Sequence, residues 1–184
     1  MRIIGGTHKR RQLHPPKNLP VRPTTDMAKE ALFSILNQWI EWEDTEALDL
    51  FSGTGSIAFE LMSRGCPRVT AVDMNRNCVL WIKKGAAELE MNSLQVVQSD
   101  VFRMLGRSSG RTYDLIFADP PYALEKMDSL PQLVFENNWL NPEGWLVMEH
   151  PVSIDFSTHK YFVRHRKYGK VNFSFFQYSS VQHD

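Results

Sequence analysis

Two patterns of apolar residues alternate along the chain. Short apolar-rich runs, typical of buried strands, lie at 46–51, 68–73, 95–99, 113–118 and 145–149. Segments with apolar residues at helical spacing lie between them, at 57–64, 75–90 and 129–139. A further helix, from a cap at Thr24 or Thr25 to Trp39, precedes the first strand. This alternation predicts an α/β domain with a doubly wound, largely parallel sheet.

The last part of the chain follows a different pattern. Residues 160–168 and 171–178 alternate apolar and polar side chains and are joined by a tight bend at Gly169, which predicts a β-hairpin. The hairpin brings the expected sheet to seven strands, with one antiparallel edge strand.

The first residues predict a separate basic arm. Residues 1–6 form a short apolar strand that ends in two glycines, and the basic stretch 7–13 returns beside it as a small hairpin. The prolines of 14–20 exclude regular structure, so this stretch is a linker. We therefore divide the chain into an N-terminal basic arm (1–22) and one main domain (23–184).

Charge is balanced overall but unevenly distributed. The 184 residues carry 21 basic and 21 acidic side chains, a formal net charge of +0. Cations dominate before residue 30, and between 160 and 170 no acid accompanies them. Such basic ends indicate either a polyanion partner at one face or merely solvated edges.

Several classes of protein are excluded. Two cysteines cannot build a metal site or a disulfide framework, and the six histidines show no spacing typical of a catalytic pair or a metal site. No stretch of eighteen apolar residues and no signal-like segment is present. We expect a monomeric, soluble, cytoplasmic protein without a metal ion or a membrane partner.

The stretch Asp119-Pro120-Pro121-Tyr122 follows the buried strand 113–118. Neither proline has an N–H group, so ladder pairing stops and the chain continues as a stiff, extended arc. A carboxylate, carbonyl oxygens and an aromatic ring thus stand at the carboxyl end of a strand, where open α/β sheets bind ligands. This acceptor-rich arc suits an exocyclic amine, and the Tyr122 ring can stack on a flat base. An ordinary Pro-Pro turn is the alternative.

A glycine-rich turn, 52–56, follows the first strand. Glycines allow a ligand to approach the backbone closely, and the spacing Gly53-x-Gly55-x-x-Ala58 half-matches a dinucleotide-binding pattern. Asp49, just before the turn, would repel a pyrophosphate but attract an ammonium group. It therefore favours a ligand with an amino-acid end, such as S-adenosylmethionine. Local capping of the turn by Asp49 is the alternative.

Two further aspartates end strands. Asp73 closes the second strand and can accept both hydroxyls of a ribose, in an adenosyl or a nicotinamide cofactor. Asp100 closes the third and can accept from an adenine amino group, with the Val101 N–H facing the ring. Each alone is equally well explained as a turn residue. Together with Asp49 and Asp119 they end four successive strands, which favours a shared role.

Two sets of motifs carry a family resemblance. The core resembles class I S-adenosylmethionine-dependent methyltransferases acting on exocyclic amino nitrogens, through Asp49-Leu50-Phe51-Ser52-Gly53-Thr54-Gly55, Asp73, Asp100 and Asp119-Pro120-Pro121-Tyr122. The remainder resembles the bacterial 16S ribosomal RNA guanine-N2 methyltransferase family, through Arg2-Ile3-Ile4-Gly5-Gly6, Lys9-Arg10-Arg11, Arg22-Pro23-Thr24-Thr25-Asp26, Glu30-Ala31-Leu32-Phe33 and Ser63-Arg64-Gly65. The resemblance runs from residue 2 to about residue 150, with Lys29 where arginine is usual.

The resemblance implies a Rossmann-like fold, S-adenosylmethionine as cofactor, and methyl transfer to a guanine N2 of ribosomal RNA, either naked or in an assembling small subunit. It implies cofactor binding by Asp49, Phe51, Ser52, Gly53, Thr54, Gly55, Asp73, Met74, Asp100 and Val101. It implies catalysis by Asp119, Pro120 and Tyr122: the Asp119 carboxylate and the Pro120 carbonyl accept the amine N–H bonds, and Tyr122 stacks on the base. It implies phosphate contacts from Lys9, Arg10, Arg11 and Arg22.

Two other functions stay open. The same tetrapeptide would serve a methyltransferase acting on DNA adenine or on a protein glutamine, although no separate target-recognition domain is evident. A non-catalytic Rossmann-type RNA-binding protein is the second alternative.

Overall fold

A single seven-stranded sheet organises the computed structural model, which describes residues 1–21 and 25–178. The strand order is β3-β2-β1-β4-β5-β7-β6. The strands are β1 (Glu46–Leu50), β2 (Arg68–Asp73), β3 (Leu94–Gln98), β4 (Tyr113–Ala118), β5 (Leu140–His150), β6 (Phe162–Tyr168) and β7 (Val171–Phe176). Strands β1 to β5 pair in parallel, whereas β7 is antiparallel to both β5 and β6. The predicted seven-stranded, mostly parallel sheet is confirmed. Its reversed strand, β7, lies one place in from the edge strand β6.

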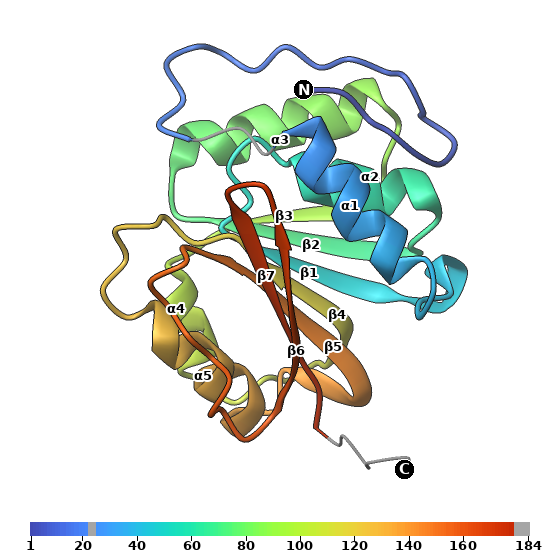
Figure 1. Cartoon of the computed structure of the whole chain (residues 1–184). Helices are drawn as coiled ribbons and strands as arrows, with labels where there is room; N and C mark the ends of the chain where they lie inside the picture. The colour runs from blue at the N-terminus through green and yellow to red at the C-terminus, as the bar shows by residue number, and fades with distance from the viewer. Residues whose placement is uncertain (22–24, 179–184) are drawn as a thin grey trace.

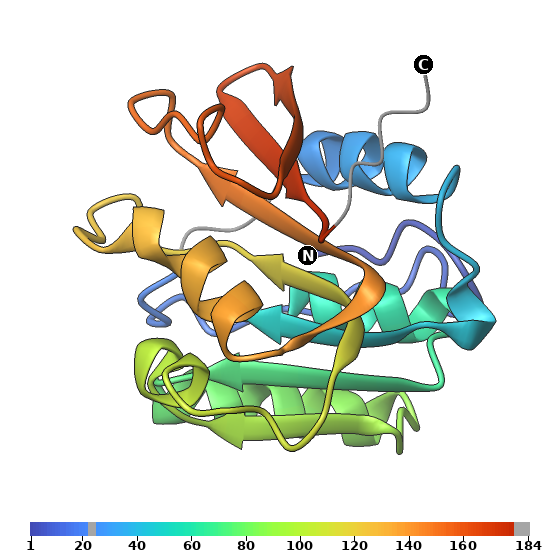
Figure 2. The same cartoon turned by 90° about the horizontal axis from the view of Figure 1, so that it is seen from below.

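Helices cover both faces of the sheet (Figures 1 and 2). One face carries α1 (Asp26–Leu36), α2 (Ser56–Arg64) and α3 (Arg76–Glu88), and the other carries α4 (Val101–Leu105) and α5 (Leu130–Glu136), with 3-10 turns at Trp42–Asp44 and Met127–Ser129. Neighbouring strand residues face different cores: Ala47 packs under α1 to α3, and Leu48 under α4 and α5. Burial on both faces explains why the strands are nearly continuous apolar runs. No helix of the described ranges is long and apolar enough to cross a membrane.

The chain order creates a crevice between β1 and β4. The sheet is built outward from β1 to β3, and the chain then crosses back so that β4 pairs with the free side of β1. Connections leave the carboxyl ends of β1 and β4 in opposite directions, which opens the usual ligand crevice of such sheets.

The structure differs from the predicted elements at three places. Residues 141–144, which separate the predicted helix 129–139 from the predicted strand 145–149, lie inside β5, because the pairing of β4 with β5 shifts there and these residues form a bulge between two paired segments. The last helix ends at Glu136, not at 139, and Asn138 adopts a positive φ of 56°. The short helix α4 has five residues, too few to produce a detectable helical period.

The N-terminal arm is a minimal hairpin, as predicted. Arg2 and Gln12 form an antiparallel bridge, and the Ile3 N–H donates to the Arg11 carbonyl at 3.0 Å. Gly6 supplies the bend, with φ of 72° and no room for a Cβ against the Ser63 carbonyl. The cap predicted for α1 is Thr25, whose hydroxyl accepts from the Ala28 N–H at 3.2 Å. Thr24 lies outside the described residues.

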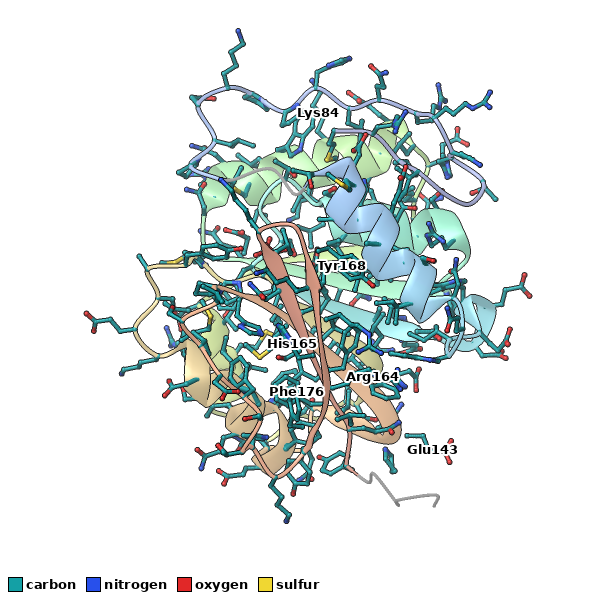
Figure 3. The ribbon with its side chains drawn as sticks, viewed as in Figure 1. Lys84, Glu143, Arg164, His165, Tyr168 and Phe176 are labelled. Atoms are coloured by element: carbon teal, nitrogen blue, oxygen red, sulfur yellow. The ribbon has the colours of Figure 1, made fainter. Side chains whose placement is uncertain are left out.

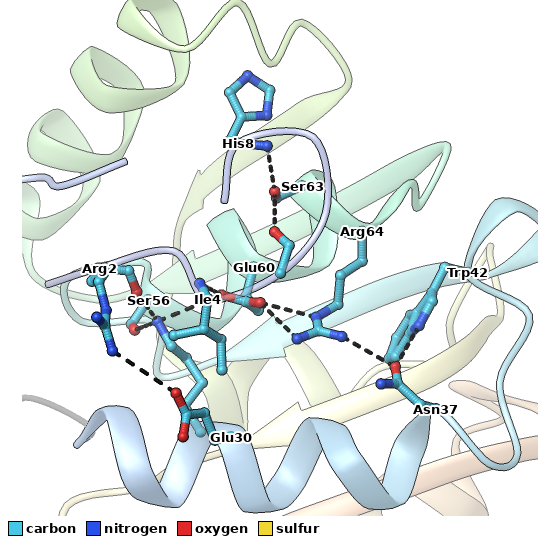
Figure 4. Close-up of polar contacts among 12 residues, drawn as sticks. Arg2, Ile4, His8, Glu30, Asn37, Trp42, Ser56, Glu60, Ser63 and Arg64 are labelled. Atoms are coloured by element: carbon cyan, nitrogen blue, oxygen red, sulfur yellow. Dashed lines mark hydrogen bonds and ion pairs between the residues drawn. The ribbon is translucent and has the colours of Figure 1, made fainter. Parts of the chain in front are cut away.

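A buried carboxylate fastens the arm to the domain (Figure 4). Glu60 of α2 has no exposed surface and accepts from the Ile4 N–H and from the Arg64 Nε, each at 2.9 Å. The Lys29 Nζ lies 3.6 Å from Glu60 and donates to the Ser56 hydroxyl at 3.2 Å. Burial lowers the pKa of Lys29, while the nearby Glu60 opposes that change. One carboxylate thus joins the arm, α1 and α2.

The turn of the arm rests on the ends of two helices, and Figure 4 shows its contact with one of them, from the His8 N–H to the Ser63 hydroxyl at 2.9 Å. The Thr7 N–H donates to the Ser63 carbonyl at 2.7 Å, and the His8 ring contacts the Leu89 carbonyl at 3.0 Å. Ser63 is near the C-terminus of α2, and Leu89 is the C-cap of α3. Because these helices run antiparallel to the strands before them, the turn lies at the amino edge of the sheet.

We predict that Glu60→Ala lowers the free energy of unfolding by about 3–5 kcal/mol, because Lys29 and Arg64 would lose their buried anion. Urea unfolding measures the effect. The matched control is Glu88→Ala, which removes an exposed ion pair with Lys84 at 3.8 Å and should cost less than about 1 kcal/mol. Equal losses in the two variants would contradict the structural role of Glu60.

Candidate functional site

A cleft of about 630 Å³ opens at the carboxyl edge of the sheet. Asp49, Asp73, Asp100 and Asp119, which end β1, β2, β3 and β4 or follow them closely, all line it. The structure therefore brings the four predicted strand-end carboxylates into one cleft. A fifth carboxylate, Glu149 of β5, lines the same cleft.

The glycine-rich turn after β1 is held in a left-handed conformation. Phe51, Gly53 and Gly55 have φ values of 59°, 53° and 78°. A Cβ on Gly55 would come within 2.9 Å of Phe59 and Ile82, so the turn can approach α2 and α3 this closely only with glycine. The turn directs the N-terminus of α2 toward the carboxyl edge of the sheet, where backbone N–H groups are available to a ligand.

Asp73 connects this turn to the end of β2. Its Oδ2 accepts from the Gly53 N–H and its Oδ1 from the Asn75 N–H, both at 2.8 Å. Each carboxylate oxygen has a further lone pair, so Asp73 can hold the turn and still accept a ligand hydroxyl. Asp100 behaves similarly: it caps α4 by accepting from the Arg103 N–H at 2.7 Å and also lines the cleft.

Asp49 is almost completely buried, with 2% of its surface exposed. Its Oδ2 accepts from the Ala58 N–H at 3.2 Å, so the capping bond considered as an alternative is present. Burial raises the pKa of the Asp49 carboxyl to about 7, and the hydrogen bonds from Ser52 and Ala58 oppose that rise. The carboxyl therefore titrates close to neutrality.

The Asp119-Pro120-Pro121-Tyr122 arc crosses the mouth of the crevice. The Asp119 N–H donates to the Leu50 carbonyl at 3.4 Å, so the arc starts beside β1. A turn follows, because the Pro121 carbonyl accepts from the Leu124 N–H at 2.9 Å. The Tyr122 hydroxyl donates to Oε1 of Glu149 at 3.1 Å, while 37% of the residue stays exposed.

Other residues that line the cleft were not predicted from the sequence. Glu149 stands at the end of the predicted fifth strand, the same signal that identified the aspartates, yet it lies outside any motif. Pro20, Val21 and Val171 come from the arm linker and from the terminal hairpin, which only the tertiary structure brings here.

Not every predicted site residue lines the cleft. Phe51, Ser52, Gly53, Thr54, Met74, Val101 and Pro120 line it with the four aspartates, whereas Gly55 does not. Lys9, Arg10 and Arg11 are exposed on the arm, at the opposite edge of the sheet (Figure 1). Arg22 lies outside the described residues. Among the residues described, no group of three or more His, Cys, Asp and Glu side chains is placed to hold a metal ion.

The doubly wound sheet, with β7 antiparallel between β5 and β6, is the fold of class I methyltransferases, which this chain shares with solved members of that class. An RNA methyltransferase from Salinibacter ruber, solved with S-adenosyl-L-homocysteine, shares this fold with a TM-score of 0.67 at 16% identity, over 89% of this chain and 98% of that one. The family model described as "Conserved hypothetical protein 95" matches residues 1–177, and the chain belongs to this family.

More similar relatives cover nearly the whole chain. The ribosomal RNA small subunit methyltransferase D of Escherichia coli K12 is 32% identical over 152 residues, which are 83% of this chain and 75% of that protein. The solved structure of E. coli yhhF, provisionally named a methyltransferase, is 29% identical with a TM-score of 0.83, over 96% of this chain and 97% of that one.

The buried Asp49 carboxyl should make the stability of the ligand-free protein depend on pH. Its folded-state pKa of about 7 exceeds the ordinary value of 3.8, so the native protein keeps a proton that the unfolded chain loses. The free energy of unfolding should therefore fall as pH rises from about 4 to 7. In Asp49→Asn this contribution is absent. Relative to wild type, the free energy of unfolding of the variant should rise by about 2 kcal/mol between pH 5 and pH 7, as measured by urea unfolding. A constant difference across this range would contradict the buried titration.

Proposed function

We propose that the protein transfers the methyl group of S-adenosylmethionine to the exocyclic N2 amine of a guanine in small-subunit (16S) ribosomal RNA. The observation that carries the proposal is the placement of the Asp119-Pro120-Pro121-Tyr122 arc in one cleft with the strand-end carboxylates. The E. coli relative named as a ribosomal RNA small subunit methyltransferase supports RNA as the substrate.

The donor and acceptor set of the cleft fits the cofactor. Bound S-adenosylmethionine supplies a methyl group that its sulfonium already activates, so neither a metal ion nor a covalent enzyme nucleophile is needed. The Asp73 carboxylate would accept hydrogen bonds from the ribose hydroxyls, and the Asp100 carboxylate would accept one from the adenine amine, beside the Val101 N–H. The turn 52–55 would allow close approach of the amino-acid end, and Asp49 would neutralise its ammonium, directly or through water.

The arc positions the amine of the target base. A guanine amine delocalises its lone pair into the ring and must be reoriented to become nucleophilic. The Asp119 carboxylate and the Pro120 carbonyl accept its two N–H bonds and direct the lone pair toward the methyl group. Their contribution is orientation and electrostatic stabilisation. Asp119 then takes the proton that leaves.

Tyr122 provides the stacking surface for a base taken out of its helix. Its ring is partly exposed at the cleft, and the hydrogen bond from its hydroxyl to Glu149 restrains its orientation. Stacking does not depend on base identity. The choice of a base that carries an exocyclic amine must therefore come from the hydrogen-bond acceptors of the arc, the Asp119 carboxylate and the Pro120 carbonyl.

We predict that Asp119→Ala lowers kcat by at least about 100-fold, because an acceptor and the proton acceptor are lost together. The assay is methyl transfer from labelled S-adenosylmethionine to small ribosomal particles from cells that lack this protein, with nucleoside analysis. The expected product is N2-methylguanosine. Cofactor affinity, measured by calorimetry, should be unchanged.

Asp128→Ala, at an exposed aspartate of the 3-10 turn Met127–Ser129, is the matched control and should keep full activity. Retained RNA binding and cellular function in Asp119→Ala would favour the non-catalytic RNA-binding alternative. Cofactor binding without methylation of any RNA would direct the search to DNA adenine or protein glutamine.

Two substitutions at Tyr122 separate the effect of ring stacking from that of the hydroxyl hydrogen bond. We predict that Tyr122→Ala raises KM for RNA roughly tenfold or more, because base–aromatic stacking contributes about 1–3 kcal/mol. Tyr122→Phe keeps the ring and should change KM much less. Steady-state kinetics with the same particles measures both. Equal losses in the two variants would assign the effect to the Glu149 bond instead.

A further inference from the structure

The cleft has the wrong charge for an RNA ligand. Asp49, Asp73, Asp100, Asp119 and Glu149 line it, and no lysine or arginine among the described residues does. Phosphates that flank a base inserted into this cleft would meet a negative field. Cations at the rim must therefore hold the RNA backbone if the proposed function, on which this inference rests, is correct.

The cations in the turn of the N-terminal arm are far from that rim. The turn carrying Lys9, Arg10 and Arg11 rests on the C-terminal ends of α2 and α3, at the amino edge of the sheet. In Figure 1 it lies on the side opposite to that toward which β1 and β2 point. These three cations cannot neutralise phosphates next to the target base.

The tip of the β6–β7 hairpin lies at the rim itself. Asn172 of β7 pairs with His150 at the carboxyl end of β5, so the preceding turn projects beyond the carboxyl edge of the sheet. Val171, the next residue after Lys170, lines the cleft. The residues Arg164, His165 and Tyr168 follow one another toward this tip (Figure 3).

The tip is basic and its charges are not balanced within the protein. Arg166, Lys167 and Lys170 are exposed, and the hairpin from 160 to 178 contains no acid. None of the ion pairs in the described part of the chain includes one of these three side chains. Arg166 pairs with Phe173 and Lys167 with Asn172, so their side chains project from opposite faces of the ribbon.

Side-chain contacts anchor the base of the hairpin to the domain, so the backbone that carries these cations is held in place. Arg164 lies over the Trp39 ring at 4.3 Å, and Trp39 packs on Phe175 at 5.4 Å. The His165 ring contacts the Asn172 Oδ1 at 3.1 Å across the two strands. A fixed ribbon loses little conformational entropy when it binds a ligand.

We propose that Arg166, Lys167 and Lys170 form a phosphate-binding surface that holds the RNA backbone beside the target nucleotide. We call these three residues the rim triad. Its ligand is the phosphate chain of the RNA segment whose base enters the cleft. The triad makes phosphate contacts, which set position and affinity without reading sequence.

The first test is the salt dependence of RNA binding. A 16S ribosomal RNA fragment that wild type methylates is titrated by fluorescence anisotropy, with S-adenosyl-L-homocysteine present. The triple variant Arg166→Ala/Lys167→Ala/Lys170→Ala should bind roughly tenfold or more weakly, and the slope of log K against log salt should fall by about 2 in magnitude. Arg166→Lys/Lys167→Arg/Lys170→Arg should keep both values, because it keeps the charge.

Two controls separate this surface from general charge effects. Lys83→Ala/Lys84→Ala removes two exposed cations of α3, and its slope should stay unchanged. Calorimetric binding of S-adenosyl-L-homocysteine should be equal in all variants, which verifies the fold. If the triple variant methylated the RNA as well as wild type did, and its slope of log K against log salt were unchanged, the role of the rim triad would be overturned and the proposed function would stand. No RNA binding or methylation by wild type would overturn both.

A second test locates the contact. The native Cys66 and Cys78 are buried, so Lys170→Cys provides a single accessible thiol for a photo-cross-linker. Cross-links from this position should map within a few nucleotides of the methylated guanine, whereas those from Lys9→Cys should map farther away. Cross-links from Lys170→Cys only at distant nucleotides would overturn the proposal.

Discussion

The position of the N-terminal arm, and with it one wall of the cleft, depends on the buried Glu60 carboxylate. A charge with no exposed surface is tolerated only where partners surround it, and Lys29, Arg64 and the Ile4 N–H do so here. These partners come from α1, α2 and the arm, so none of the three segments can move independently. The linker then crosses from the arm to the carboxyl edge, where Pro20 and Val21 line the cleft. An ion-pair cluster remote from the reacting groups thereby fixes the entrance to them.

The sheet and its acidic edge could be predicted because they follow from local pattern. Strands buried on both faces are apolar throughout, and a polar residue that ends such a run must lie at an edge of the sheet. This logic placed Asp49, Asp73, Asp100 and Asp119 together. It applies equally to Glu149, which was missed because no motif marked it.

The remaining features depend on contacts between segments far apart in sequence. The arm turn is directed by bonds from Thr7 to Ser63 and from His8 to Leu89, and no local pattern encodes these pairs. Lys29 of α1 lies buried against Glu60 of α2, a contact between segments about thirty residues apart. Residues 141–144 have the composition of a turn, yet tertiary pairing on both sides of them absorbs them into β5 as a bulge.

The ladder between β5 and β7 has a further consequence for the choice of nucleotide. Glu149, which holds Tyr122, pairs directly with Phe173, two residues beyond the first residue of β7. The Tyr122 ring is hydrogen-bonded to β5 and the hairpin tip continues into β7, so both are tied to one pair of strands, whose register the buried Phe173 and Phe175 side chains fix. If Tyr122 stacks on the target base and the rim triad holds its phosphates, as proposed above, the distance between the two is set by this pair of strands. The protein would then select a nucleotide by the shape of the RNA backbone rather than by the sequence around the base.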